Sequence, residues 1–405
     1  MIKRWLLDEL QHKIEYRRGV HLTGARQVGK STLAGMVSLE KCRRYTLDAK
    51  KVREVAAGDP YGFVKHVAGE TLVIDEIQKV PELLDAIKIV VDRDNSKGQY
   101  LLTGSSNLHF AKTVKDSLAG RLGRIRLRPL SYGEINGKAP SFLACAFARE
   151  FKSEYADIDK RGIIEIGFTG GYPEPLEFST SERREWFQEY LEDILDKDVK
   201  DVTEIRKIAA LRSVAIWLLA HSSQFFSVDE LAAKTGISKV TAENYLETLK
   251  ALYLFDRIPA WSRSDYDLLG KRPKWIAGDT GMIASLLGWK TEEVYFDDLR
   301  NGKFVESWVY QQLAATADTT GGYEITHYRD NKKREIDFMV EREDGAVLGV
   351  EVKAGTVSQD DFAHLKWFAA NLAKIPFTGI VLYSGKDVLR FGEGFYAVPL
   401  SALGA

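Results

Sequence analysis

Eight consecutive residues near the N-terminus have the types and spacing of a loop that binds phosphate groups. They are Gly24, Ala25, Arg26, Gln27, Val28, Gly29, Lys30 and Ser31, a full match to the pattern Gly-x4-Gly-Lys-Ser/Thr. In this pattern the glycines let the backbone curl, so that its N–H groups point at phosphate oxygens. The lysine reaches the outer phosphates, and the serine hydroxyl can bind Mg²⁺. We therefore expect this segment, together with Thr32, to bind a nucleoside triphosphate with Mg²⁺.

The residues on either side of this loop have the patterns of a strand and a helix. A short apolar run, 20–22, precedes the loop as a buried parallel strand would, and a helical stretch follows from Ser31 to Leu39. The first turn of such a helix carries the positive end of the helix dipole, which favours anions. The context therefore supports the interpretation of the loop as a phosphate site.

A second apolar run ends in two carboxylates. Residues 71–76 are Thr-Leu-Val-Ile-Asp-Glu. Because ligands of open α/β sheets lie at the carboxyl ends of the strands, we expect Asp75 and Glu76 to lie beside the phosphates. Asp75 would hold Mg²⁺ through water, and Glu76 would polarise the attacking water. The second acid favours hydrolysis over simple nucleotide binding.

A third strand and the segment after it supply further candidates. The run 99–107 ends in small polar residues, where Ser105 would sense the γ-phosphate; a plain polar turn is the alternative. Arg and Ile or Leu alternate between Arg124 and Arg128, which predicts a strand with one basic face. Arg121 is a candidate arginine finger or sensor, with Arg124 as a second candidate; otherwise they are surface charges. Action of Arg121 in trans would require a homo-oligomer, and action in cis would not.

Near the C-terminus, charged residues fall on two short apolar runs. Residues 334–340 and 347–353 flank a turn at Gly345, which predicts a β-hairpin. Strand alternation puts Glu351 and Lys353 on one face, and Asp337 can lie beside Glu351. These two carboxylates can share Mg²⁺ or Mn²⁺, and Glu306 on a preceding helix can reach the same edge. Lys353 can steady a hydroxide or a developing phosphate charge. The set predicts metal-dependent phosphodiester cleavage, with a surface hairpin and a Glu351–Lys353 ion pair as the alternative.

The middle of the chain is predicted to be helical. A turn at 170–174, Gly-Gly-Tyr-Pro-Glu, interrupts the pattern, and a long helix is expected from Ser181 to about Val199. Residues 227–258 follow the order helix, glycine-containing turn, helix and strand, which is the order of a winged helix-turn-helix. The exposed side of the second helix mixes lysines with glutamates, so direct DNA contact and a structural or protein-docking role both remain open.

These motifs resemble two known families. The segments 24–31, 73–78, 102–106, 119–121 and 129–134 resemble those of prokaryotic AAA-type ATPases of the archaeal-ATPase kind. The helix with Glu306, the strand with Asp337 and the strand with Glu351-x-Lys353 resemble the PD-(D/E)XK nuclease fold, although Ile336 stands where that fold often has proline. Together the motifs resemble a group of prokaryotic ATPases with a restriction-endonuclease-like C-terminus, and this resemblance implies ATP as the nucleotide. An inactive nuclease fold kept for binding is a further alternative.

We therefore predict an α/β protein of three domains. The boundaries are a P-loop AAA-type ATPase domain at 1–135, a helical region with a winged helix-turn-helix at 136–265, and a PD-(D/E)XK nuclease-like domain at 266–405. The leading hypothesis is an ATP-hydrolysing protein whose last domain acts on or binds DNA. The alternative is a nucleotide-driven switch whose last domain only binds, and the third is a scaffold with vestigial sites.

Composition excludes some other classes. The 405 residues include 57 Lys and Arg and 58 Asp and Glu, so the net charge is -1, which argues against a nonspecific nucleic-acid binder or a polybasic membrane binder. Apolar residues make up 45% and charged residues 28%, which is typical of a globular protein. No run approaches the roughly 18 apolar residues of a membrane helix. The N-terminus contains acidic residues too early for a signal peptide, and Cys42 and Cys145 are expected to be reduced thiols, so we expect a cytoplasmic protein.

Overall fold

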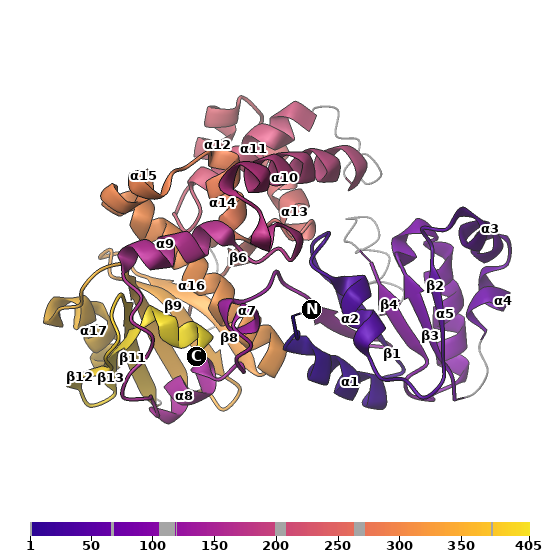
Figure 1. Cartoon of the computed structure of the whole chain (residues 1–405), viewed down its shortest axis with the longest axis horizontal. Helices are drawn as coiled ribbons and strands as arrows, with labels where there is room; N and C mark the ends of the chain where they lie inside the picture. Colours follow the sequence, from indigo (N-terminus) through magenta and orange to yellow (C-terminus); the bar gives the residue numbers. More distant parts are fainter. Residues whose placement is uncertain are drawn as a thin grey trace.

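The computed structural model of the chain describes residues 2–65, 69–104, 118, 120–198, 208–262, 272–373 and 376–405. These residues form an N-terminal α/β unit, a helical unit and a C-terminal unit built on a second sheet (Figure 1). The N-terminal segment lies between the first sheet and the C-terminal unit (Figure 1). Within the described part of the chain, none of the helices has the length and apolarity that crossing a bilayer requires.

The first unit contains one parallel sheet of five strands, in the order β2-β3-β4-β1-β5; β2 was not predicted, and the other four strands lie at predicted positions. Its strands are β1 (Gly19–Thr23), β2 (Cys42–Thr46), β3 (Thr71–Asp75), β4 (Tyr100–Thr103) and β5 (Gly123–Arg126). Its helices are α1 (Leu6–Tyr16), α2 (Lys30–Met36), α3 (Lys50–Gly58), α4 (Pro60–Val64) and α5 (Glu82–Arg93), with a 3-10 turn η1 (Ile77–Lys79). The central strands are buried along most of their length because helices cover a parallel sheet. The carboxyl ends of β1, β3 and β4 therefore meet at one edge.

The helical unit contains the helices and the strand expected at 227–258. Its elements are α9 (Lys160–Thr169), η2 (Glu174–Glu177), α10 (Thr180–Asp193), the π-helix η3 (Ile194–Asp198), α11 (Ile208–Ala220), α12 (Val228–Thr235), α13 (Lys239–Ala251), β6 (Phe255–Ile258), β7 (Lys274–Ala277), α14 (Thr280–Leu287) and α15 (Thr291–Phe296). Gly236 ends α12 with a φ of 67°, and Ser238 caps α13. The order helix, turn, helix and strand is confirmed, and β6 pairs with β7 in antiparallel fashion.

The C-terminal unit is a six-stranded sheet in the order β12-β13-β11-β10-β9-β8. Its elements are α16 (Asp298–Thr320), β8 (Tyr323–Arg329), β9 (Glu335–Arg342), β10 (Val347–Lys353), η5 (Gln359–Phe362), α17 (Ala363–Asn371), β11 (Phe377–Tyr383), β12 (Leu389–Gly392), β13 (Phe395–Pro399) and η6 (Leu400–Gly404). The predicted hairpin is present as antiparallel β9 and β10, with Phe338 opposite Val350. Asp337 and Glu351 are the next positions on the two strands, as the alternation predicted.

The segment that follows the first sheet joins the C-terminal unit. It contains α7 (Tyr132–Ile135) and α8 (Phe142–Ala148). Phe142, Leu143 and Ala146 share a hydrophobic core with α16 and the C-terminal sheet. Trp275 and Met282, beyond the predicted second boundary, share a core with α10 to α13. The chain therefore passes between the units more than once, and each unit is packed against its neighbours.

Candidate functional site

The phosphate loop has the backbone that its glycines were predicted to allow. Gly24, Gln27 and Gly29 all have positive φ, of 147°, 60° and 96°. A Cβ on Gly24 would lie 2.2 Å from the carbonyl oxygen of Leu127, so only glycine fits there. The loop therefore curls tightly between β1 and α2.

Lys30 lies inside this curled loop. Its side chain is 6% exposed, and its ammonium donates to the carbonyl oxygens of Gly24 at 3.1 Å and Ala25 at 2.7 Å. These contacts place the positive charge at the loop, where the sequence pattern predicts the outer phosphates of a nucleotide.

Three oxygen-bearing side chains meet at the ends of α2, β3 and β4. The Ser31 hydroxyl donates to both carboxylate oxygens of Asp75, at 2.9 and 3.0 Å, and the Thr103 hydroxyl donates to one of them. Hydroxyl and carboxylate oxygens are the ligands that Mg²⁺ prefers, so Ser31 and Asp75 fit the predicted role. Thr103, fully buried at the end of β4, was not predicted as a site residue; its place at a strand end was the available signal. Ser105 lies outside the described residues.

Glu76 directly follows β3 in an unusual backbone conformation. Its φ is 58°, which is uncommon for a residue with a side chain and marks a constrained position. Its carboxylate accepts a hydrogen bond from the side-chain amide of Gln78. Gln78 thus orients the predicted catalytic acid, Glu76, a role for Gln78 that was not predicted from the sequence.

The structure does not bring Arg121 to the phosphate loop. Its guanidinium donates to both carboxylate oxygens of Asp92 near the end of α5, at 2.6 and 2.8 Å. The parallel register puts Gly123 beside Val20, whereas the phosphate loop begins after the other end of β1. Val20 is four strand residues, roughly 13 Å, from Gly24, and Arg121 precedes Gly123, so it lies toward the opposite end of the strand from the loop. This geometry gives no support to action in cis.

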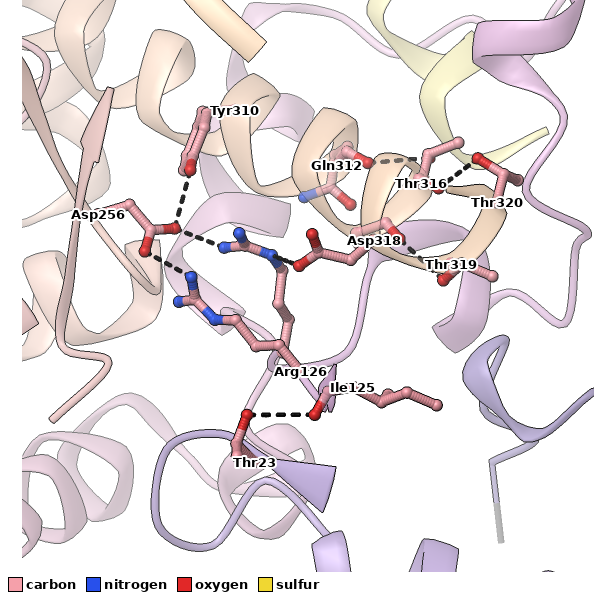
Figure 2. A network of polar contacts seen from close by, with 12 residues as sticks. Thr23, Ile125, Arg126, Asp256, Tyr310, Gln312, Thr316, Asp318, Thr319 and Thr320 are labelled. Carbon is pink, nitrogen blue, oxygen red and sulfur yellow. Dashed lines mark hydrogen bonds and ion pairs between the residues drawn. The ribbon is translucent and has the colours of Figure 1, made fainter. Parts of the chain in front are cut away.

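The other arginines of this segment form a network between the units (Figure 2). Arg126 donates to one carboxylate oxygen of Asp256 on β6 at 2.7 Å, and Arg128 donates to the other at 2.5 Å. Arg128 also bonds Asp318 of α16 at 2.6 Å, and the Tyr310 hydroxyl bonds Asp256 at 2.8 Å. Burial raises the pKa of Asp256, but the two guanidiniums outweigh burial and hold that pKa well below its ordinary value. Arg126 and Arg128 are therefore paired with the buried Asp256 and, for Arg128, with the exposed Asp318, whereas Arg124 of the predicted basic face is exposed.

Arg4 ties the phosphate loop to the segment that leaves the first sheet. Its guanidinium donates to the Val28 carbonyl at 2.8 Å, to the Arg128 carbonyl at 2.6 Å and to the Glu134 carboxylate at 3.0 Å. Glu134 in turn accepts from the backbone N–H of Ser131 at 2.9 Å. One buried guanidinium thus connects the loop with the residues around Glu134.

A cavity of about 430 Å³ lies beside the phosphate loop. The loop and α2 form one wall through Val28, Gly29 and Thr32, and the segment 173–178 forms another. The turn predicted at 170–174 therefore reaches the nucleotide side of the first unit.

The carboxylates predicted in the C-terminal unit do converge, but around a lysine. Lys274 of β7 is fully buried, and its ammonium lies 2.5 Å from a Glu306 oxygen, 3.3 Å from a Glu335 oxygen and 3.8 Å from an Asp337 oxygen. Burial raises the pKa of Glu306, but Lys274 and Lys303 outweigh it and lower that pKa to about 2. Neither Lys274 nor Glu335 was predicted as a member of this cluster.

For Asp337 and Glu351, unlike Glu306, the nearby lysines do not outweigh the effect of burial on the pKa. Burial, with a smaller contribution from the negative charge of Glu306, raises the pKa of Asp337 to about 6. Burial, with a smaller contribution from the negative charge of Asp337, raises the pKa of Glu351 well above its usual range. Lys353, the predicted third member, is partly exposed and lies 3.4 Å from Asp361 instead.

The donor set of this cluster does not fit a metal ion as it stands. The Lys274 ammonium already lies among Glu306, Glu335 and Asp337, and like charges repel. In the part of the chain that the structure describes, no group of three or more His, Cys, Asp or Glu side chains is arranged to hold a metal.

The second helix of the expected helix-turn-helix, α13, does not present free positive charge at its two lysines. Lys239 pairs with Asp229 at 3.0 Å, and Lys250 pairs with Glu247 at 2.9 Å. The mixed charge predicted for this helix is thus arranged as local ion pairs.

Comparison with known proteins gives partial matches. Residues 16–136 match a family described as an AAA domain, and residues 160–293 and 301–403 match two domains of unknown function, DUF8612 and DUF4143. The uncharacterized protein Rv2008c of Mycobacterium tuberculosis is 27% identical over 408 residues, covering 97% of this chain and 84% of the relative. The uncharacterized protein MJ1544 of Methanocaldococcus jannaschii is 27% identical over 296 residues, covering 69% of this chain and 60% of the relative.

A solved structure is also similar in part. The RuvB Holliday junction branch migration motor of Thermotoga maritima is 16% identical and covers 63% of this chain and 86% of its own. Its TM-score of 0.27 is too low to establish a shared fold. The sequence match at 16–136, the parallel sheet and the curled phosphate loop agree with one another. The N-terminal unit is thus similar to AAA-type P-loop domains in both sequence and fold.

Proposed function

We propose that this protein hydrolyses ATP and that the nucleotide state changes how the ATPase domain meets the rest of the chain. The observation that carries the proposal is the arrangement at one sheet edge: Lys30 within the loop, Ser31 on Asp75, and Glu76 at the end of β3. A Mg²⁺ ion held through Ser31 and Asp75 would neutralise phosphate charge. Glu76, oriented by Gln78, would polarise the attacking water.

The cavity beside the phosphate loop could hold the nucleoside part of the nucleotide, while the loop holds the triphosphate. Apolar side chains of Ile2, Leu130 and Phe178 line it, as expected for a site that covers a flat base, and Glu174 offers a polar edge. We infer that the segment 173–178 contacts the base.

The contacts of the phosphate loop supply a route for coupling. The segment 126–134 touches the loop through Leu127, which packs against Gly24, and through Arg4. The same segment holds Asp256 and Asp318 through Arg126 and Arg128 (Figure 2). A shift of the loop on nucleotide binding would therefore strain these ion pairs, which join all three units.

Replacing Asp256 with asparagine should weaken this route. We expect Asp256→Asn to lower the free energy of unfolding by about 1.5–3 kcal/mol, the range for hydrogen bonds to charged groups. The lowered pKa of Asp256 means that its contribution is present above the ordinary value of 3.8 and is lost as acid protonates it. The difference between wild type and variant should therefore shrink below about pH 4, as measured by urea unfolding.

Hydrogen exchange tests the coupling itself. A non-hydrolysable ATP analogue should change exchange in α16 more in wild type than in Asp256→Asn, where the Arg128–Asp318 pair still joins the segment to α16, with nucleotide affinity kept. Asp229→Asn, which breaks the exposed pair with Lys239, is the matched control and should change stability by about 1 kcal/mol or less. An unchanged response of α16 in Asp256→Asn would contradict the proposed route.

In this proposal the C-terminal domain binds a partner, with DNA as the candidate, and does not cleave it. The observation in favour is Lys274, whose ammonium already compensates the carboxylates that a metal would need. Arg121, if it acts as an arginine finger, would act on the nucleotide of a second copy in a homo-oligomer.

Metal-dependent DNA cleavage is the second candidate function. The observation that favours it is the adjacent pair of buried carboxylates, Asp337 and Glu351, whose pKa values are raised by burial and by neighbouring carboxylates although lysines lie nearby. If this candidate is right, plasmid and single-stranded DNA are cut in Mg²⁺ or Mn²⁺, and Asp337→Ala abolishes cutting while DNA affinity stays. Absence of cutting by wild type, with ATP hydrolysis intact, would reject this candidate and leave the binding domain.

A further inference from the structure

A second cavity, of about 390 Å³, lies where the helical unit meets β8. Phe225, Ala260 and Arg272 line it from the helical unit, and the segment 327–331 lines it from the C-terminal unit. The two sides are joined by backbone: Trp261 donates to the His327 carbonyl at 2.6 Å, and His327 donates to the Pro259 carbonyl at 3.1 Å. The cavity is therefore formed by both units together.

The polar lining of this cavity includes two arginines, Arg272 and Arg329, and one acid, Asp330. Arg272 and Arg329 are both exposed, and the guanidinium of Arg329 lies over the Phe225 ring, 4.5 Å from its centre. The carboxylate of Asp330 does not cancel them, because it is bonded by Arg334 at 2.6 Å. The described residues offer Arg272 no ion-pair partner, and the nearest acid to Arg329 is Glu335, at 3.8 Å.

Positive charge continues outside the cavity on the turn between β8 and β9. Lys332 and Lys333 follow Asn331, are exposed, and do not line the cavity. Neither has an ion-pair partner among the residues described by the structure, in contrast to Lys239 and Lys250 of α13. We call Arg272, Arg329, Lys332 and Lys333 the basic rim.

We propose that the basic rim binds consecutive phosphates of a nucleic-acid strand. Guanidinium and ammonium groups are the usual partners of backbone phosphates, and they position a strand without reading its sequence. A site for one free phosphate would need cations only in the cavity, whereas here they extend along the turn. The basic rim is therefore a better candidate for nucleic-acid contact than α13, because Lys239 and Lys250 of that helix are already paired with acids.

This inference names the partner of the C-terminal domain in the proposed function, but it does not depend on ATP hydrolysis. Binding is therefore measured on the full chain without nucleotide or divalent metal, so that its failure and a failure of hydrolysis are separate results. The probes are a labelled oligothymidylate and a labelled duplex of equal length, followed by fluorescence anisotropy as salt is raised from about 50 to about 200 mM.

The double variant Lys332→Ala/Lys333→Ala should bind the single strand more weakly. Because each phosphate contact on a single strand contributes about 0.7 to the slope of log affinity against log salt, the slope should fall by about 1.4. Lys50→Ala/Lys51→Ala, which removes two adjacent exposed lysines from α3, is the matched control and should behave as wild type. Arg272→Ala/Arg329→Ala should also weaken binding, and melting curves confirm that the variants are folded.

Three results would overturn the proposal. One is wild-type affinity and slope in the lysine double variant. Another is an equal loss in the Lys50 and Lys51 control. The third is displacement of the oligonucleotide by thymidine monophosphate at the same phosphate concentration, which would indicate a pocket for a single phosphate group. Binding of either the single strand or the duplex supports the proposal.

Discussion

Replacing Lys30 with alanine is expected to lower the rate of ATP hydrolysis by about 10²–10³-fold, the loss found when one preorganised donor to a developing negative charge is removed. Lys30 is 6% exposed and its ammonium is placed by the carbonyl oxygens of Gly24 and Ala25, so it is already positioned before phosphate arrives. Such preorganisation costs no rearrangement at the moment of reaction. Steady-state phosphate release with ATP and Mg²⁺ measures the effect.

Two further variants test whether a loss of ATP hydrolysis in Lys30→Ala comes from the nucleotide site. Glu76→Gln should keep nucleotide affinity while turnover falls, because it removes the carboxylate that would polarise water and leaves the phosphate loop intact. Lys51→Ala, at an exposed position of α3, should hydrolyse ATP as wild type does. Turnover of Lys30→Ala at the wild-type rate would show that the loop is not the catalytic site. No turnover by wild type, with or without DNA, would reject the ATPase proposal altogether.

The nucleotide site could be predicted because its chemistry is local in the chain. The loop from Gly24 to Ser31 carries its own backbone geometry, and Asp75 is found by the rule that ligands lie at the carboxyl ends of parallel strands. The same rule points to the end of β4, where Thr103 bonds Asp75, although the prediction chose Ser105. The short pattern around Arg121 does not show at which end of the sheet that arginine lies, so it leaves action in cis and in trans open.

The contacts between units could not be predicted, because they depend on residues far apart in the sequence. Arg126 and Asp256 are separated by 130 positions, and the alternating arginines have the pattern of an exposed strand face. The hairpin placed Asp337 beside Glu351 as predicted. Lys274, however, comes from another sheet and lies 32 positions before Glu306. A single lysine after Arg272 and Pro273 has the local pattern of a surface charge, so only the packing of β7 shows that it is buried.

Replacing Lys274 with methionine is expected to lower the free energy of unfolding by about 3–5 kcal/mol, the cost of leaving buried charges without their partner. Methionine keeps much of the side-chain volume between the rings of Phe225 and Phe338, so lost charge and not a cavity would explain the effect. Glu306 would keep Lys303, but Asp337 and Glu335 would lose the ammonium that lies between them. Urea unfolding at neutral pH measures the loss.

Lys303→Met is the matched control, because it also removes an ammonium from Glu306. The Lys303 side chain is 27% exposed, so water can partly replace it and the loss should be smaller. Equal losses in the two variants would contradict a special role for Lys274. Melting with Mn²⁺ then separates the two interpretations of the cluster. If the ammonium serves in place of a metal, Mn²⁺ leaves wild type unchanged and stabilises only Lys274→Met; stabilisation of wild type would favour the metal-dependent candidate.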